Sequence, residues 1–145
     1  MKGGLSMIVR NCAGGIVFCG DKVFLLKNEK DEWVLPKGKI RDRRSPREVA
    51  LERVEDEAGI TAEILTAAGD TTYEFFSVTR RQPVCNRVHW YVMKAENTKY
   101  RIAFEQGFRD GDYFPVEEAI EKVTYSQDKS LVRVSYEKYK EELGI

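Results

Sequence analysis

Residues 35–60 read LPKGKIRDRRSPREVALERVEDEAGI, and this stretch decides how the rest of the chain is interpreted. The residues at 33–35 predict a short strand, and residues 36–44 predict a basic loop that contains one glycine. Residues 45–58 predict an amphipathic helix, which Gly59 ends. An acidic helix that follows a basic loop has the chemistry to hold a metal ion and a phosphate chain.

The predicted helix carries clear signals at its start and along its faces. Ser45 can cap it, Pro46 suits the first helical position, and Glu48 completes a capping box. At about 100° per residue, one side is apolar and is expected to face the core: Ala50, Leu51, Val54 and Ala58. Arg53, Asp56 and Glu57 share another side at helical spacing. The helix therefore presents one arginine and two carboxylates together.

Length and composition favour one folded domain over residues 1–145. A chain of 145 residues buries roughly two-thirds of its unfolded surface in a single core. Its 42% hydrophobic and 33% charged residues are typical of globular proteins. The 24 basic residues balance the 24 acidic ones, so a general attraction to nucleic acid is not supported.

Cysteine and histidine usage favours a cytoplasmic protein without a structural zinc site. Cys12, Cys19 and Cys85 form an odd set without a CxxC pair, and we expect reduced thiols. His89 is the only histidine, so a structural zinc site lacks ligands. A run of about 18 apolar residues and a signal-peptide core are both absent, so no membrane association is expected.

The order of the predicted elements favours an α+β fold. Strands are expected at residues 7–19, 22–27, 60–68, 71–78, 87–94 and 112–115, with a turn at Gly69 and Asp70. Further helices are expected at residues 115–123 and 126–143, the latter packing on the sheet through Leu131, Val134, Tyr139 and Leu143. Gly14 and Gly15 inside the first strand indicate a bulge or a close approach by another group. This order predicts a mixed, mostly antiparallel sheet sandwiched between helices (α/β/α).

The central stretch resembles the box of the Nudix family, G-x5-E-x7-R-E-U-x-E-E-x-G-U, where U is a bulky aliphatic residue. The matching positions, without insertion, are Gly38, Val54, Glu57, Gly59 and Ile60, and Asp56 replaces one Glu. An AGGIVF strand before the box and YFPVEEAIEKVTY near the end extend the resemblance over most of the chain. WVLPKGKI looks most like the branch that hydrolyses diadenosine tetraphosphate and diphosphoinositol polyphosphates. The resemblance implies a Nudix fold, a diphosphate-containing substrate, and Mg²⁺ or Mn²⁺ as cofactor.

Three departures from the box fall on its chemistry. Arg44 stands where the family has Glu, Glu52 where it has Arg, and Arg53 where it has Glu. In the family, the carboxylates at positions 53, 56 and 57 bind metal and help to activate water. Unit charges at about 4 Å interact by about 4 kcal/mol at an effective dielectric near 20, and roughly twice that for a divalent ion. We therefore expect either that Arg53 turns away or that the usual metal position is lost.

Two hypotheses accommodate the departures. Mg²⁺ often binds through only one or two carboxylates, so Asp56 and Glu57 are predicted metal ligands and catalytic residues, with Glu52 turned in as a third. Alternatively, Arg53 itself contacts a phosphate of the substrate. The exchanged pair Arg44 and Glu52 is expected to keep an ion pair between loop and helix with its polarity reversed.

Candidates outside the helix have a functional and a structural interpretation each. Glu105 stands where related enzymes often carry a further metal ligand or base, and is otherwise a solvated loop carboxylate. Lys37 and Lys39 flank Gly38 and are predicted to contact phosphate, although lysines are common on surfaces. Tyr125 is a candidate for stacking on a nucleobase.

Two functions follow from these residues. The first is a metal-dependent Nudix pyrophosphohydrolase that cleaves a nucleoside diphosphate linked to another group, with activity weakened by the departures. The alternative is a catalytically inactive Nudix-fold module that binds a nucleotide or another phosphorylated ligand. A protein-interaction role is a third, weaker interpretation. Either a monomer or a homodimer is compatible with the sequence.

Overall fold

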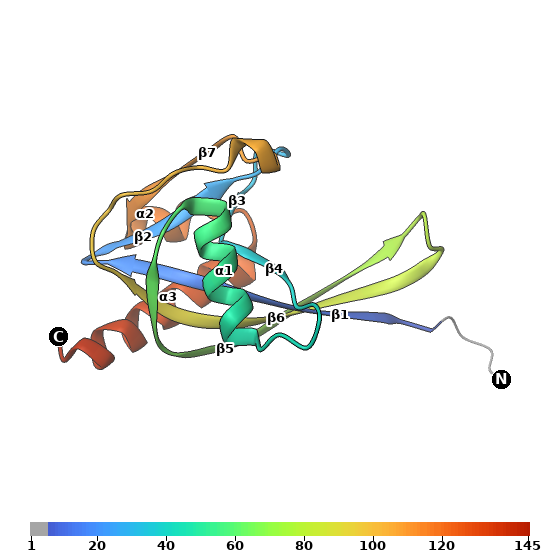
Figure 1. Ribbon diagram of the computed structural model, residues 1–145, viewed down its shortest axis with the longest axis horizontal. Coiled ribbons are helices and arrows are strands. Elements are labelled where there is room, and N and C mark those ends of the chain that lie inside the picture. Colours follow the sequence, from blue (N-terminus) through green and yellow to red (C-terminus); the bar gives the residue numbers. More distant parts are fainter. Residues whose placement is uncertain (1–5) are drawn as a thin grey trace.

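The structure, a computed structural model that describes residues 6–145, has an α+β fold with one seven-stranded mixed sheet (Figure 1). The first five residues lie outside the described part, and the single domain expected over residues 1–145 stays a prediction. The strands are β1 (Ile8–Cys19), β2 (Lys22–Lys27), β3 (Trp33–Val34), β4 (Lys37–Lys39), β5 (Ala62–Ser77), β6 (Gln82–Ala95) and β7 (Asp110–Pro115). The α-helices are α1 (Pro46–Ala58), α2 (Val116–Lys122) and α3 (Ser126–Leu143), and residues 104–106 form a 3-10 turn.

The sheet has the order β3-β2-β1-β6-β5, with β4 paired to β1 and β7 paired to β2. Strands β1 and β6 are parallel, and the other pairings are antiparallel. The expected mixed, mostly antiparallel sheet is confirmed. Strands β1 and β6 can pair in parallel because the connection between them, which contains α1 and β5, is long enough for a crossover.

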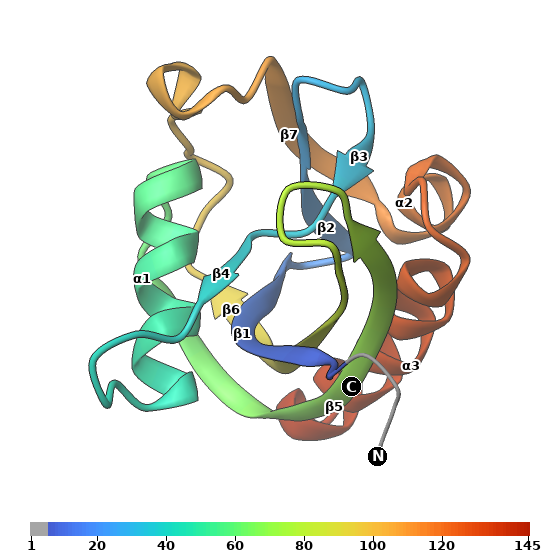
Figure 2. The ribbon, with the colours of Figure 1, turned by 90° about the vertical axis from the view of Figure 1, so that its right-hand side faces the viewer.

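Helices cover both faces of the sheet, as expected for an α/β/α sandwich (Figure 2). Alternate residues of β1 supply the two cores, because neighbouring side chains of a strand point to opposite faces. Ala13 and Val17 pack under α1. Ile16 and Phe18 pack against α2 and α3. Each fully buried side chain of this kind contributes about 1.5–3 kcal/mol, so the two cores fix the position of α1 relative to the strands.

The two glycines of β1 mark a close approach, as the sequence indicated. The backbone N–H of Gly15 donates to the carbonyl oxygen of Pro36 at 3.1 Å. A Cβ on Gly14 would lie 2.4 Å from that oxygen and 2.6 Å from the ring of Trp90. Only glycine fits here, and its absence of a side chain lets residues 36–38 run directly beside β1.

The expected turn at Gly69 and Asp70 is wrong. Both residues lie inside β5, which continues unbroken to Ser77. The pairing with β6 shifts register at residues 64–66 and 67–69, and Gly69 has a φ of 97°. A glycine with positive φ suits a β-bulge as well as a turn, and the sequence alone does not distinguish the two.

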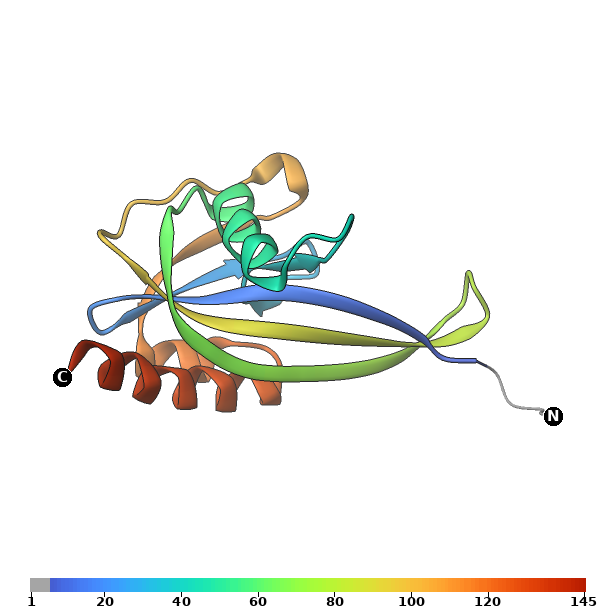
Figure 3. The same cartoon turned by 60° about the horizontal axis from the view of Figure 1, so that its bottom comes forward.

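The hairpin of β5 and β6 is consequently longer than expected. Strand β6 begins at Gln82, five residues before the predicted strand, and the turn occupies residues 78–81. Figure 3 shows these strands and the start of β1 reaching beyond the helices as a curved arm. Strand β7 begins two residues earlier than expected, at Asp110.

The face of α3 that packs on the sheet differs from the expected one. Leu131, Val132 and Tyr139 are buried, whereas Val134 is 51% exposed. The buried set also includes Asp128 and Ser135, so the face follows one i, i+3, i+4 stripe on which two positions are polar. No helix in the part of the chain that the structure describes is long and apolar enough to cross a membrane.

Candidate functional site

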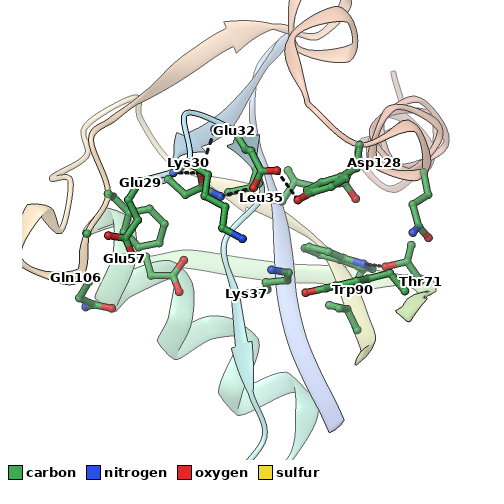
Figure 4. A pocket seen from close by; sticks show the side chains of 18 residues that line it. Glu29, Lys30, Glu32, Leu35, Lys37, Glu57, Thr71, Trp90, Gln106 and Asp128 are labelled. Carbon is green, nitrogen blue, oxygen red and sulfur yellow. Dashed lines mark hydrogen bonds between the residues drawn. The ribbon is translucent and has the colours of Figure 1, made fainter. Parts of the chain in front are cut away.

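A pocket of about 430 Å³ opens beside the C-terminal end of α1 (Figure 4). It is lined by β3, β4, β5 and β6, by the ends of α1 and α3, and by the loops at 28–32 and 106–108. Glu57 and Gln106 lie at one end, Asp128 and Thr71 lie at the other, and Lys37 lies between them. A ligand that fills this pocket therefore meets a carboxyl group at each end and a lysine between them.

Glu57 reaches the pocket from the buried face of α1. Glu57 is 4% exposed, and the helix ends at the next residue, Ala58, after which the cap residue Gly59 adopts a left-handed φ of 64°. Burial raises the pKa of Glu57 to about 7, while the nearby charges of Arg53 and Lys37 act in the opposite direction. A carboxyl with this pKa in a pocket wall is a candidate general base.

Arg53 turns toward the carboxylates of α1. Its Nε and Nη2 donate to Oε2 of Glu57 at 3.1 Å and 2.9 Å, and its Nη1 lies 3.6 Å from Oδ2 of Asp56. Nη2 also donates to the side-chain oxygen of Gln106 at 2.9 Å. Of the two outcomes expected for Arg53, the structure has the one in which a guanidinium occupies the space beside the box carboxylates.

The donor set beside the box does not suit a resident divalent metal in this arrangement. Glu57 and Asp56 are both paired with Arg53, and Glu52 is paired with Arg44. Within residues 6–145, no group of three or more His, Cys, Asp or Glu side chains is placed to hold a metal ion. A metal ion entering here would be repelled by the guanidinium of Arg53. Asp56 and Glu57 would have to break their ion pairs with Arg53 before they could bind the metal ion.

Among the described residues, Glu105 does not form a metal-binding group with the carboxylates of α1. It lies exposed in the 3-10 turn, whereas its neighbour Gln106 faces the box. The side chain of Gln106 accepts from Arg53 and donates to the backbone oxygen of Asp56 at 3.3 Å. The side-chain amide of Gln106 therefore joins the loop at residues 106–108 to α1, through its hydrogen bonds to Arg53 and to the backbone of Asp56.

Arg44 and Glu52 form the ion pair that the sequence suggested, with the arginine on the loop and the glutamate on α1. Nη2 of Arg44 contacts Oε2 of Glu52, and its Nε lies 3.5 Å from Oε2 of Glu48. Both members of the main pair are partly exposed, at 39% and 44% for their side chains. The pair connects the basic loop to α1.

Reversing Arg44 is expected to destabilise the fold modestly. Arg44→Glu places a third carboxylate beside Glu48 and Glu52, and we expect a loss of about 1 kcal/mol in the free energy of unfolding, because exposed pairs have small energies. The double variant Arg44→Glu with Glu52→Arg should regain most of the lost free energy of unfolding. Urea unfolding of the three proteins measures this, and equal midpoints for wild type and Arg44→Glu would contradict the pair's role.

Strand β4 consists of Lys37, Gly38 and Lys39, and its two lysines line different depressions of the surface. Lys37 lines the pocket, and its charge partly offsets the rise in pKa that burial causes at Glu57 and Asp128. A Cβ on Gly38 would lie 2.6 Å from Cδ of Arg53, so only glycine lets the arginine stem lie across this strand. Lys39 does not line this pocket but a neighbouring groove.

The far end of the pocket is aromatic and contains one buried acid. Asp128 is 9% exposed, and burial raises its pKa to about 6. Its carboxylate has no hydrogen-bond donor among the residues that the structure describes. Trp90 is nearly buried, and its Nε1 donates to Thr71 Oγ1 at 2.8 Å. A ligand with N–H donors would supply the hydrogen bonds that this carboxylate lacks.

Tyr125 closes part of the pocket through a hydrogen bond to Glu32. Its hydroxyl donates to Oε2 of Glu32 at 2.6 Å, and this bond raises the pKa of Tyr125 to about 12. Asn28 donates to the other carboxylate oxygen of Glu32 at 3.0 Å. The ring lies at the pocket wall and is 47% exposed, so the predicted stacking on a nucleobase remains a prediction.

Sequence reasoning missed Asp128, Gln106 and Glu32. A usable signal existed for Asp128, because it lies on the same helical stripe as Leu131 and Val132 and is the one charged residue there. No comparable signal identifies Gln106 or Glu32, because each lies in a polar loop whose path depends on the folded structure.

Comparisons with known proteins agree with this architecture. The chain matches the NUDIX domain over residues 6–134. Similar solved structures include a C. elegans Ap4A hydrolase, with a TM-score of 0.70 and 21% identity over 90% of this chain and 96% of that one. A MutT protein from Methanosarcina mazei has a TM-score of 0.72 and 16% identity over 94% and 99% of the two chains. The E. coli dihydroneopterin triphosphate pyrophosphohydrolase has a TM-score of 0.69 and 12% identity over 86% and 94%.

Proposed function

This chain belongs to the Nudix family, and from that premise we propose that its pocket binds a nucleoside diphosphate linked to another group without appreciable hydrolysis. The observation that carries the proposal is the position of Arg53, whose guanidinium is hydrogen-bonded to the buried carboxylate of Glu57. In this arrangement a guanidinium of the protein, instead of a metal ion, is the partner of the box carboxylates.

The chemistry of the two pocket ends supports this class of ligand. Lys37, which lines the pocket, offers N–H donors and positive charge to a diphosphate. Arg53 lies beside the lining, where it is paired with Glu57. At the other end, Asp128 offers acceptor oxygens to the N–H groups of a base, beside the aromatic rings of Trp90 and Tyr125. The volume of about 430 Å³ is within the usual range for small-molecule sites.

The family implies a divalent metal, and the described donor set does not fit one without rearrangement of Arg53. We therefore assign no step of ligand binding to Mg²⁺ or Mn²⁺. The three cysteines are free thiols, which supports a reducing compartment such as the cytoplasm as the proposed location.

Titration calorimetry with diadenosine tetraphosphate in EDTA tests the proposed binding. We expect wild type to bind, and Lys37→Ala to weaken binding about tenfold, because a charge-assisted hydrogen bond contributes about 1.5–3 kcal/mol. Lys94→Ala is a matched control, because this lysine lies on β6 and outside the pocket lining. Equal affinities for wild type and Lys37→Ala would contradict the proposed pocket.

A pyrophosphohydrolase is the second candidate, favoured by the buried carboxyl of Glu57 in the pocket wall. With a pKa near 7, this group is partly ionised at neutral pH and can accept a proton from water. Product formation with Mg²⁺ or Mn²⁺ measures this activity, and Glu57→Gln should reduce it by 10²–10⁴-fold, as is common when a general base is removed. Turnover that Glu57→Gln abolishes would establish this candidate over the non-hydrolysing module.

A further inference from the structure

The curved arm of the sheet extends beyond the helices at one end of the molecule (Figure 3). We define the arm as residues 8–11 of β1 together with residues 71–87, which contain the end of β5, the turn and the start of β6. Its three strands pair without a break, β1 with β6 and β6 with β5. The arm is therefore an ordered piece of sheet whose exposed side chains are open to a partner.

The charge of the arm differs from that of the whole chain. The chain has 24 basic and 24 acidic residues, whereas the arm has one carboxylate, that of Glu74, and four arginines: Arg10, Arg80, Arg81 and Arg87. The last three arginines are exposed, and Arg10 is half-buried. In the part of the chain from residue 6 onward, none of the four forms a salt bridge. Their positive charges are therefore available to an anionic partner.

One face of the arm carries aromatic rings beside these charges. Neighbouring residues of a strand point to opposite faces, so Tyr73 and Phe75 share a face. The strand pairing places Arg10 and Asn86 in one row with Tyr73. The centroids of the two rings lie 6.0 Å apart, with 26° between the ring planes. Tyr73 is 44% exposed and Phe75 is 40% exposed, so both rings are accessible to a flat group.

Both rings are held in place by the neighbouring strand. The side-chain amide of Asn86 donates to the hydroxyl of Tyr73 at 2.8 Å. Phe75 lies directly opposite Val84, which is fully buried. Side chains that are already fixed lose little conformational entropy when a partner binds. The two rings therefore form a prepared surface for stacking.

We propose that this face of the arm binds a single-stranded nucleic acid, whose bases stack on Tyr73 and Phe75 and whose phosphates contact the arginines. Stacking on aromatic rings and neutralisation of phosphates are the interactions that bind single strands without regard to sequence. A single strand is required because the bases of a duplex are paired and stacked on each other.

The arm is a site separate from the proposed nucleotide pocket. The lining of the pocket includes Tyr73, but it includes neither Phe75 nor any of the four arginines of the arm. The proposal therefore goes beyond the proposed function and does not rest on it.

A second copy of this chain is the other partner that an exposed apolar arm could bind. Phe76 is 56% exposed and Val78 is 83% exposed, and apolar strands at the edge of a sheet tend to pair with another chain. Two arms side by side would bring both sets of arginines together with only the two Glu74 carboxylates between them. Like charges disfavour such a pairing. The charges of the arm therefore favour a polyanion over a second copy.

Fluorescence anisotropy with labelled strands of about 12 nucleotides, a length within the usual site sizes, tests the proposal. The probes are oligouridylate and oligothymidylate with a 5′-hydroxyl end, and a duplex of the same length, each titrated with the full chain in EDTA. We expect the single strands to bind more tightly than the duplex, and the tighter of the two identifies the preferred sugar. The logarithm of the association constant should fall with the logarithm of salt concentration with a slope of about −3, because each contacted phosphate contributes about −0.7.

Two variants separate the charges from the rings. Arg80→Gln with Arg81→Gln should weaken binding about tenfold and make the salt slope shallower by about 1.4, because two phosphate contacts are lost. Phe75→Leu should weaken binding about tenfold without changing the slope, because it removes a stacking ring and no charge. Arg101→Gln with Arg133→Gln is the matched control, which removes the same charge from exposed positions outside the arm and should bind like wild type. Arg80 and Arg81 are exposed, so their variant keeps the fold and decides the test even if Phe75→Leu loosens the arm.

Four outcomes would count against the arm or against the pocket. If neither single strand binds at low salt, or if Arg80→Gln with Arg81→Gln binds like wild type, the arm proposal is overturned. Displacement of the strand by diadenosine tetraphosphate would also overturn it, because the strand would then occupy the pocket. A dimer that Phe76→Ser dissociates, without any strand bound, would assign the arm to a second copy instead. If the strands bind as expected and diadenosine tetraphosphate does not bind, the proposed function fails and the arm stands.

Discussion

Replacing Asp128 with asparagine is expected to stabilise the fold at pH 8 and to weaken ligand binding. Burial raises the pKa of Asp128 from 3.8 to about 6. Between these two values the folded chain holds a proton that the unfolded chain releases, so stability falls as pH rises through this window and stays low above it. The difference corresponds to about 3 kcal/mol at pH 8, which a neutral asparagine would recover.

Denaturant unfolding at pH 4 and pH 8 measures this effect. The gain from Asp128→Asn should be large at pH 8 and nearly absent at pH 4, where the folded carboxyl is protonated. Asp21→Asn is the control, because Asp21 is an exposed residue at the turn between β1 and β2. A free energy of unfolding that is equal or lower in Asp128→Asn at pH 8 would show that the carboxylate has stabilising partners after all.

The same substitution should reduce affinity for the nucleotide. Asparagine replaces one acceptor oxygen of Asp128 by an NH₂ donor, and a ligand N–H that faced this oxygen would lose its hydrogen bond. We expect about a tenfold lower affinity for diadenosine tetraphosphate, because hydrogen bonds to charged groups contribute about 1.5–3 kcal/mol. A more stable protein that binds less well is typical of a residue kept for function.

Removing the charge of Arg53 is the second change with a large expected effect. Arg53→Met keeps an apolar stem over Gly38 but leaves the buried carboxylate of Glu57 without its partner. Breaking a buried ion pair commonly costs 3–5 kcal/mol, and we expect about 2–3 kcal/mol at pH 8 because Arg53 is partly exposed. At pH 5 the loss should be small, since the pKa of Glu57 is about 7 and its carboxyl is then neutral.

Thermal unfolding across this pH range distinguishes the charge effect from a packing effect. A loss that is equal at pH 5 and pH 8 would mean that the arginine stem, not its charge, stabilises the fold. Arg53→Glu provides a second measurement, because it restores the carboxylate that the family has at this position. We expect Mg²⁺ to raise the melting temperature of Arg53→Glu and to leave that of wild type unchanged.

Local patterns in the sequence were sufficient for most of the fold. The capping box at Ser45 and the glycine pair in β1 depend on residues close in the chain, and both are found where expected. The apolar face of α1 is found in part: Ala50, Val54 and Ala58 are buried as expected, whereas Leu51 is only partly buried and Val49 and Glu57 are buried as well. Boundaries that depend on pairing were not predictable. Gly69 breaks a strand pattern in the sequence, but its partner strand β6 continues past it and keeps β5 intact.

The candidate site was predictable in its ion pairs and not in its full lining. The reversed pair of Arg44 and Glu52 follows from spacing on one helix and one short loop. The orientation of Arg53 does not, because it depends on Gln106, which lies 53 positions away in the sequence. Asp128 likewise becomes a pocket residue only because α3 packs beside β5 and β6.

The most direct test of the account is the affinity of the wild-type chain for diadenosine tetraphosphate, measured by calorimetry in EDTA and again in Mg²⁺. The account predicts the same affinity in both buffers, because Lys37 in the pocket and Arg53 beside it supply the positive charge that the ligand's phosphates need. Binding that is detected only in Mg²⁺ would contradict it, since the box would then hold a metal despite Arg53.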